Sequence, residues 1–148
     1  MTEIIQHTST RLAPFGESIF STMSRLAVEH KAVNLGQGFP DFDGPDFVKD
    51  AAKRAIDSGF GQYARAFGLP ETNRAISRYT ERFCGFAADP EREITVTAGC
   101  TEAIAAVLLG LCNPSDEIVL LDPSYDSYAA CVAMSSATAR RVQLNGPD

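Results

Sequence analysis

The 148-residue sequence lacks any cluster of basic side chains. Its formal net charge is −6 and its isoelectric point is near 4.9. Nucleic-acid backbones are bound mainly by grouped Lys and Arg, so this composition argues against a nucleic-acid partner. A small, metabolite-like ligand is favoured instead.

Metal-ligand patterns are missing as well. The sequence contains no CxxC pair; its four cysteines are Cys84, Cys100, Cys112 and Cys131. The two histidines, His7 and His30, each stand alone. No spacing typical of a zinc site is present, and we expect buried or free thiols in a reducing cytosol.

No apolar run is long enough to cross a membrane. The longest, residues 103–112, is far short of the roughly 20 residues that a membrane helix needs. The opening MTEIIQHTST has no basic flank followed by an apolar core. These features predict a cytoplasmic protein with no membrane partner.

Three well-known signatures are also absent. The sequence has neither the GxxxxGK[ST] of a nucleotide P-loop nor the GxGxxG of a dinucleotide site, which disfavours a Rossmann oxidoreductase. Ser124 does not lie in GxSxG, and neither histidine is near a cysteine in sequence. A hydrolase therefore has little support.

The chain nevertheless has the composition of a soluble globular domain, with 45% hydrophobic and 22% charged residues. Apolar residues recur at helical spacing over residues 18–30, 46–58 and 71–86. Ser18 or Glu17 is a suitable start for the first helix, and Gly59 is a suitable stop for the second. Three helices are predicted.

From residue 94 the pattern alternates between strand and helix. We expect strands at 94–98, 118–121 and 140–144, with helices at 101–112 and 129–136. This order is typical of an α/β fold with a mostly parallel sheet. Three strands would leave exposed sheet edges, so the sequence is expected to be the opening, truncated part of a larger protein and to be partly folded or poorly soluble alone.

Two segments follow predicted strands directly. In TAGCTEAIAA (97–106) a glycine precedes a helix start, which is a favourable place for phosphate; the alternative is an ordinary connection in which Gly99 makes the turn and Thr101 caps the helix. In DPSYDSY (122–128), Tyr125 or Tyr128 offers a flat face for an aromatic ligand at the carboxyl end of a strand. The alternative is packing against the next helix.

Two further segments are rich in glycine. In NLGQGFPDF (34–42) the backbone could approach a ligand carboxylate closely, or the segment is a connecting loop. GQYARAFG (61–68) contains Tyr63 and Arg65, and its local chemistry favours a loop that faces solvent.

Taken together and in this order, the four segments resemble the N-terminal half of the class I/II aminotransferases of fold type I, which use pyridoxal 5′-phosphate (PLP). The sequence is most similar to the branch with kynurenine, glutamine, methionine and N-succinyldiaminopimelate aminotransferases. The resemblance runs from about Arg11 to Leu144. It implies the opening part of the PLP-dependent transferase fold, with an N-terminal arm and substrate-side loop at 1–45 and the first part of the PLP-binding large domain at 46–148.

The resemblance also implies site residues. Backbone N–H groups at Gly99, Cys100 and Thr101 would hold the PLP phosphate, and Tyr125 would stack on the pyridine ring. Tyr63 would reach the PLP phosphate of a neighbouring subunit, which implies a homodimer. Gly38 would lie beside the substrate α-carboxylate, and Phe20 would line the substrate pocket.

The family's Schiff-base lysine lies well downstream of the DPxY segment, whereas the lysines here are Lys31, Lys49 and Lys53, all upstream of the first predicted strand. No catalytic residue is therefore assigned. By resemblance the parent reaction transfers an amino group between an amino acid and a 2-oxo acid, and the chain alone is expected to be inactive. The alternative is a non-catalytic dimerisation or ligand-binding module.

Overall fold

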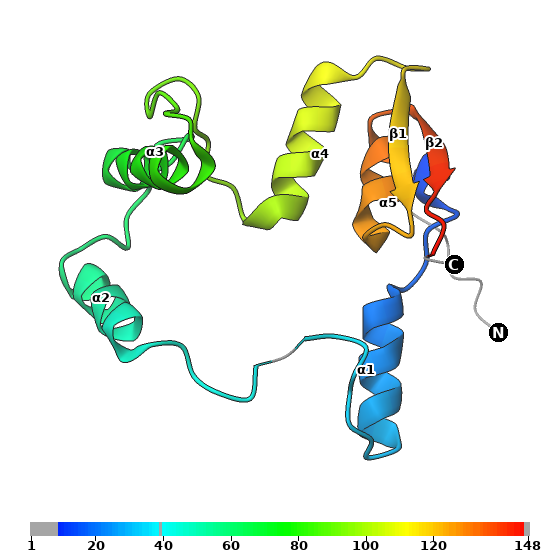
Figure 1. Ribbon diagram of the computed structural model, residues 1–148, viewed down its shortest axis with the longest axis horizontal. Helices are drawn as coiled ribbons and strands as arrows, with labels where there is room; N and C mark the ends of the chain where they lie inside the picture. The colour runs from blue at the N-terminus through cyan, green and yellow to red at the C-terminus, as the bar shows by residue number, and fades with distance from the viewer. Residues whose placement is uncertain (1–8, 39, 147–148) are drawn as a thin grey trace. The chain divides into compact units, whose positions relative to one another are not determined.

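A computed structural model describes residues 9–38 and 40–146. The chain forms two compact units: unit 1 comprises the chain up to Gly38 and from Ala98 onward, and unit 2 comprises Phe39–Thr97. His7, Phe39 and the first eight residues of the predicted N-terminal arm lie outside the described residues. Figure 1 labels the α-helices and β-strands of both units.

Unit 1 begins with a short 3-10 helix, η1 (Thr10–Leu12), and helix α1 (Ile19–Glu29). Ser18 is the N-cap of α1, and its hydroxyl accepts a hydrogen bond from the Phe20 N–H at 3.2 Å. Such a cap satisfies one of the N–H groups that a helix start leaves without an intrahelical partner. The helix predicted for residues 18–30 is confirmed.

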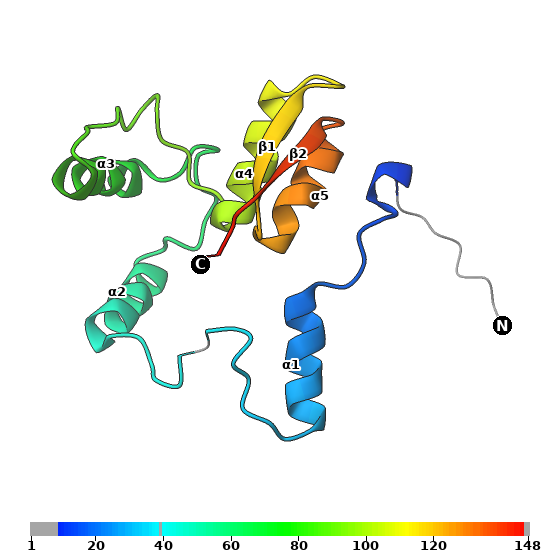
Figure 2. The same cartoon turned by 45° about the vertical axis from the view of Figure 1, so that its right-hand side comes forward.

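The second part of unit 1 runs α4 (Gly99–Leu111), β1 (Glu117–Asp122), α5 (Asp126–Met134) and β2 (Thr138–Gln143). The strands pair in parallel, with Glu117 opposite Thr138 and Asp122 opposite Gln143. Helix α5 contacts both strands and α4, and the strands lie side by side in Figures 1 and 2. The predicted α/β fold with parallel strands is confirmed, although α5 begins three residues before the predicted helix.

The strand predicted at residues 94–98 is wrong. Residues 94–97 have no strand assignment, and Ala98 is already the N-cap of α4. The Val96 N–H bonds instead to the carbonyl of Phe67 in a loop, at 3.1 Å. An alternating sequence makes a strand only when another strand supplies the ladder partners, and within 9–38 and 40–146 none lies beside this segment.

The buried centre of unit 1 is small. Among the described residues, the buried hydrophobic side chains are Leu120 on β1 and Cys131 and Val132 on α5. Ser135 is also buried, and its hydroxyl donates to the Val132 carbonyl at 2.8 Å. Burial raises the pKa of the Cys131 thiol, and all four cysteines are free.

Unit 2 contains helices α2 (Asp46–Asp57) and α3 (Pro70–Cys84), which confirms the two helices predicted there. A glycine with positive φ follows each helix: Gly59 at 86° and Gly85 at 79°. Asn73 on α3 is fully buried, and its amide donates to the carbonyls of Phe67, Pro90 and Ile94 at 3.2, 3.1 and 3.3 Å. This side chain holds the loops on both sides of α3 together.

Within the part of the chain that the structure covers, no helix combines the length and apolar character needed to cross a bilayer.

Candidate functional site

The first turn of α4 has an unusual backbone. Gly99 opens the helix with φ +84°, and no atom lies within 4 Å of the position that a Cβ would take there. The glycine is therefore required by conformation rather than by space. Ala98 is the N-cap, so the alternative in which Thr101 caps the helix is wrong, and Thr101 lies inside the first turn.

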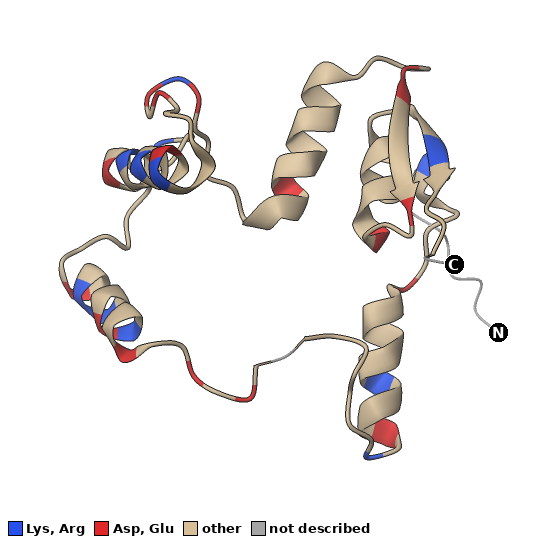
Figure 3. Cartoon of the chain, viewed as in Figure 1, with Lys and Arg blue, Asp and Glu red and all other residues tan. Residues whose placement is uncertain are grey.

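Glu102 is the single charged residue of α4, visible as the red segment near the start of that helix in Figure 3. Its carboxylate folds back and accepts a hydrogen bond from the Ala98 N–H. A negative charge at this end is favoured by the helix dipole. Because Glu102 bonds to the residue before the helix, the N–H groups of Cys100 and Thr101 remain as first-turn donors without an intrahelical partner.

Tyr125 lies just beyond the end of β1 and is the N-cap residue of α5. Its ring centroid is 5.5 Å from that of Phe20 and 5.7 Å from that of Tyr128. Tyr125 is nevertheless 48% exposed. The structure thus brings together two predicted site residues, Phe20 and Tyr125, and leaves part of the tyrosine accessible.

A second contact joins the same two elements. The Ser18 hydroxyl donates a hydrogen bond to the Asp126 carboxylate in the first turn of α5. Ser18 therefore caps α1 and attaches its start to α5 through a single side chain, which accounts for the position of Phe20 against Tyr125.

A cavity of about 570 Å³ lies at the starts of α1, α4 and α5. Its lining residues are Pro14, Phe15, Gly16, Glu17, Ser18, Ile19, Thr101, Tyr125, Asp126, Ser127 and Ala130. This volume falls in the usual range for small-molecule sites, about 300–1,000 Å³. Thr101 of the proposed phosphate segment and Tyr125 of the proposed ring-stacking segment share its wall.

A second cavity, of about 400 Å³, lies at the carboxyl ends of β1 and β2 and is also lined by Tyr125. There Nη1 of Arg141 lies 3.0 Å from each carboxylate oxygen of Asp122. Sequence reasoning missed Arg141. The signal that could have found it is strand alternation: Arg141 pairs opposite Leu120, two residues from Asp122 on the same face of the sheet.

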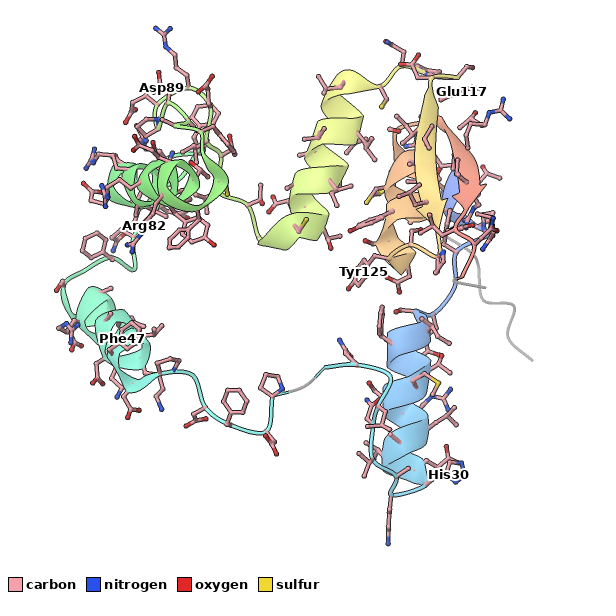
Figure 4. All side chains as sticks on the ribbon, viewed as in Figure 1. His30, Phe47, Arg82, Asp89, Glu117 and Tyr125 are labelled. Carbon is pink, nitrogen blue, oxygen red and sulfur yellow. The ribbon has the colours of Figure 1, made fainter. Side chains whose placement is uncertain are left out.

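The other end of the sheet carries a matching pair. Arg140 Nε donates to Glu117 Oε1 at 2.8 Å. This hydrogen bond, reinforced by the arginine's charge, lowers the pKa of Glu117 and raises that of Arg140. Figure 4 shows Glu117 and Tyr125 at opposite ends of β1.

Two predicted site residues, Gly38 and Tyr63, are not among the residues that line these cavities. Gly38 is exposed at the end of a segment that Asn34 anchors, because the Asn34 amide donates to Ser24 Oγ at 3.2 Å. Tyr63 belongs to unit 2, and its side chain is fully exposed. Its neighbour Arg65 has a structural contact, an ion pair with Glu91 at 2.7 Å.

Throughout 9–38 and 40–146, no group of three or more His, Cys, Asp or Glu side chains is arranged to hold a metal ion.

The model of the family "Aminotransferase class I and II" matches residues 30–148. Methionine aminotransferase of Escherichia coli (strain K12) is 43% identical over 138 residues, which are 93% of this chain and 36% of that protein. A probable N-succinyldiaminopimelate aminotransferase of Mycobacterium tuberculosis is 48% identical over 137 residues, 93% of this chain and 34% of that protein. The chain thus spans about a third of the length of these curated relatives.

The solved structures show the same similarity. N-succinyldiaminopimelate aminotransferase from Mycobacterium tuberculosis superimposes with a TM-score of 0.90 at 46% identity. The match covers 95% of this chain and 37% of that one. The resemblance deduced from the four sequence segments is confirmed at the level of the family and of the branch.

Proposed function

Because the chain belongs to the class I and II aminotransferases, we propose that unit 1 supplies one side of a PLP site. The observation that carries this proposal is the shared cavity: Thr101, at the start of α4, and Tyr125, at the start of α5, line the same space. A helix start suits a phosphate, and a half-exposed tyrosine suits an aromatic ring.

In this proposal the first turn of α4 binds the phosphate. The N–H groups of Cys100 and Thr101 are the donors, and the positive φ of Gly99 gives the turn that precedes them. The helix dipole adds to the attraction. The Glu102 carboxylate is occupied by the Ala98 N–H, so it does not compete for these first-turn donors.

Tyr125 then orients the ring of the cofactor. PLP, when bound, supplies the electron sink that allows an amino group to pass between an amino acid and a 2-oxo acid. The contact of Phe20 with Tyr125 covers one part of the tyrosine and reduces its freedom to turn. Phe20 is the candidate for the apolar wall of the substrate pocket.

We further propose that the chain alone does not transfer amino groups. Of its three lysines, Lys49 pairs with Asp46 at 2.9 Å and Lys53 with Asp50 at 3.2 Å, all on α2 in unit 2. Lys31 follows α1 in unit 1 and lines neither of the cavities that contain Tyr125. None of the three lines a cavity that contains Tyr125, and the proposal gives none of them the role of the covalent lysine.

The remaining parts of the proposal follow the family. The substrates are an amino acid and a 2-oxo acid, with Gly38 beside the substrate carboxylate. The protein is a cytoplasmic homodimer in which Tyr63 reaches the neighbouring subunit's phosphate site; its fully exposed side chain is compatible with that role. The division into an arm at 1–45 and a large-domain part at 46–148 also stays a proposal.

The test is a titration of the chain with pyridoxamine 5′-phosphate, which has the phosphate and ring of PLP but no aldehyde to react with surface lysines. We expect saturable binding, competition by inorganic phosphate, and clear weakening by Tyr125→Ala. Tyr79→Ala, on α3 in unit 2, is the matched control and should bind as the wild type does. Equal affinity for the Tyr125→Ala and Tyr79→Ala variants would rule out the proposed ring contact.

A non-catalytic dimerisation or ligand-binding module is the alternative. The observation in its favour is the exposure of large apolar side chains such as Val33 at 83% and Leu35 at 90%, since such surfaces often bind a partner. Sedimentation of the chain with and without pyridoxamine 5′-phosphate separates the two functions: tight association with no ligand binding favours the module.

A further inference from the structure

The end of β1 is held by contacts from Arg141 and Gln143 of β2 and from Leu144, which directly follows β2. Asp122 receives the Nη1 contacts of Arg141 on both carboxylate oxygens at 3.0 Å. Its backbone carbonyl accepts the N–H of Leu144 at 2.7 Å and the side-chain amide of Gln143 at 3.4 Å. The Asp122 side chain is only 21% exposed, so its charge is better shielded from solvent than that of an ordinary surface carboxylate.

Only Pro123 and Ser124 separate this fixed point from Tyr125. Tyr125 is the N-cap of α5, and its backbone carbonyl accepts a hydrogen bond from the Tyr128 N–H at 3.2 Å. The conformation of Tyr125 is therefore set by a short connection whose upstream end is Asp122. Tyr125, Asp122 and Arg141 all line the cavity of about 400 Å³.

We propose that Arg141 is a positioning residue: through Asp122 it orders the 122–126 connection and thereby sets the orientation in which Tyr125 presents its ring to the cofactor. The claim that Arg141 affects cofactor binding rests on the proposed function. The claim that Arg141 orders Tyr125 does not. Arg141 has no contact with the reacting groups in this proposal.

Arg140 provides a matched control. It is the adjacent residue on β2, it also pairs with an acidic residue of β1, and its partner Glu117 lies at the opposite end of the strand from Tyr125 (Figure 4). Arg140→Gln removes a similar cross-strand pair and the same charge without touching Asp122. Any difference between Arg140→Gln and Arg141→Gln therefore reports on the connection to Tyr125.

The first measurement is hydrogen exchange of the ligand-free chain over residues 124–128. A cross-strand ion pair contributes up to about 1 kcal/mol, or roughly fivefold in an opening equilibrium, so we expect Arg141→Gln and Asp122→Asn each to speed exchange there about fivefold. The double variant should be no faster than either single variant, because both remove one interaction. Arg141→Lys should stay close to the wild type, since a single nitrogen makes both contacts.

The second measurement is the circular dichroism induced in bound pyridoxamine 5′-phosphate, which depends on the orientation of the neighbouring tyrosine. At saturating ligand, Arg141→Gln should give a reduced signal, while Arg140→Gln and Arg141→Lys keep it. If Arg141→Gln matches Arg140→Gln in both measurements, the proposal is overturned. If it reduces binding while Asp122→Asn does not, Arg141 contacts the ligand directly and the positioning role is wrong.

The two proposals fail differently. Wild-type chain that does not bind pyridoxamine 5′-phosphate contradicts the proposed function, yet the exchange of residues 124–128 still decides whether Arg141 orders Tyr125. A loss of the helical circular dichroism signal would show that the Arg141→Gln variant does not fold. The Asp122→Asn variant, which keeps the arginine, then provides the exchange measurement that decides whether the Arg141–Asp122 pair orders Tyr125.

Discussion

Gly99 and Gly110 both belong to α4, but their backbone conformations differ. Gly99 has φ +84°, whereas Gly110 near the other end of α4 has no positive φ. A Cβ would meet no atom within 4 Å at either position. Any difference between alanine substitutions at these sites therefore comes from backbone conformation and not from crowding.

We expect Gly99→Ala to destabilise the first turn of α4 by about 1–2 kcal/mol, the cost of a left-handed conformation for a residue with a Cβ. Gly110→Ala should instead stabilise the helix by about 0.5–1 kcal/mol because it lowers the entropy of the unfolded chain. Hydrogen exchange of the α4 amides measures both. Effects of the same sign would show that φ at Gly99 is not the deciding factor.

For single residues, the sequence allowed a prediction of local backbone conformation but not of side-chain contacts between residues far apart in the chain. A glycine between a predicted strand and a helix is a visible sign of a turn, and the structure has the positive φ there. Arg141 was missed because its partner Asp122 lies on another strand: strand alternation shows that the two side chains share a face only once the register of β1 against β2 is known. Ser18 was predicted as a start of the first helix, but its hydrogen bond to Asp126 was not, because the two residues lie 108 positions apart in the sequence.

Among the elements, α1 depends on a single residue at its start. Ser18 accepts the Phe20 N–H and donates to Asp126 of α5. Apart from these bonds, the ring contact of Phe20 with Tyr125 also links the two helices. The cap and the attachment of α1 are therefore lost together when the hydroxyl is removed.

Ser18→Ala should destabilise α1 by about 1 kcal/mol, the usual cost of losing an N-cap side chain, and should also loosen Phe20 from Tyr125. Ser21→Ala, in the exposed first turn of the same helix, is the control and should leave both unchanged. Fluorescence anisotropy of the tyrosines and exchange of the α1 amides report the two effects. Equal behaviour of the two serine variants would contradict the role of Ser18.

The pairing of β1 with β2 has a pH dependence through Glu117. Its pKa lies below the ordinary value of 4.5 because Arg140 donates to the ionised carboxylate. A carboxylate with a lowered folded-state pKa stabilises the fold above the unfolded-state pKa and loses that contribution as pH falls through the folded-state pKa.

Wild-type chain should thus be more stable than Glu117→Gln near neutral pH, and the difference should shrink as the pH falls below 4.5 and disappear once it is below the lowered folded-state pKa of Glu117. The effect is modest because both side chains are largely exposed. Acid titrations followed by far-ultraviolet circular dichroism measure it. Curves that keep a constant separation down to low pH would be inconsistent with a Glu117–Arg140 pair.

Element prediction succeeded for the helices, whose hydrogen bonds are local, and for the strands predicted at 118–121 and 140–144, but it failed for the strand predicted at 94–98. The three predicted helices at 18–30, 46–58 and 71–86 appear within two residues of their expected ends, since a helix satisfies its own backbone. Residues 94–98 have as good a strand pattern as 118–121, but only the latter have a parallel partner. A strand therefore depends on a second segment that supplies its hydrogen-bond partners.

For the molecule as a whole, apolar burial is small compared with apolar exposure. Leu120, Cys131 and Val132 are the buried hydrophobic residues of the described chain, whereas large side chains such as Phe47 at 74% and Leu111 at 76% are exposed. Burial of apolar surface is the main driving force of folding. The chain alone is therefore expected to be weakly cooperative.

We expect the isolated chain to bind anilinonaphthalene sulfonate strongly, to associate as its concentration rises, and to melt over a broad range. Fluorescence, light scattering and a thermal scan test these expectations together. A sharp melt without dye binding would show that the exposed side chains are covered in solution.

Because unit 1 is built from two separate segments of the chain, its parts are synthesised at different times. Its two segments are separated by unit 2, and the Ser18–Asp126 contact joins residues 108 positions apart. At roughly 5–20 residues per second, a ribosome makes α1 about 5–20 s before α5. An 11-residue helix is marginal by itself, so α1 is expected to stay largely unfolded on the nascent chain until α5 has been made.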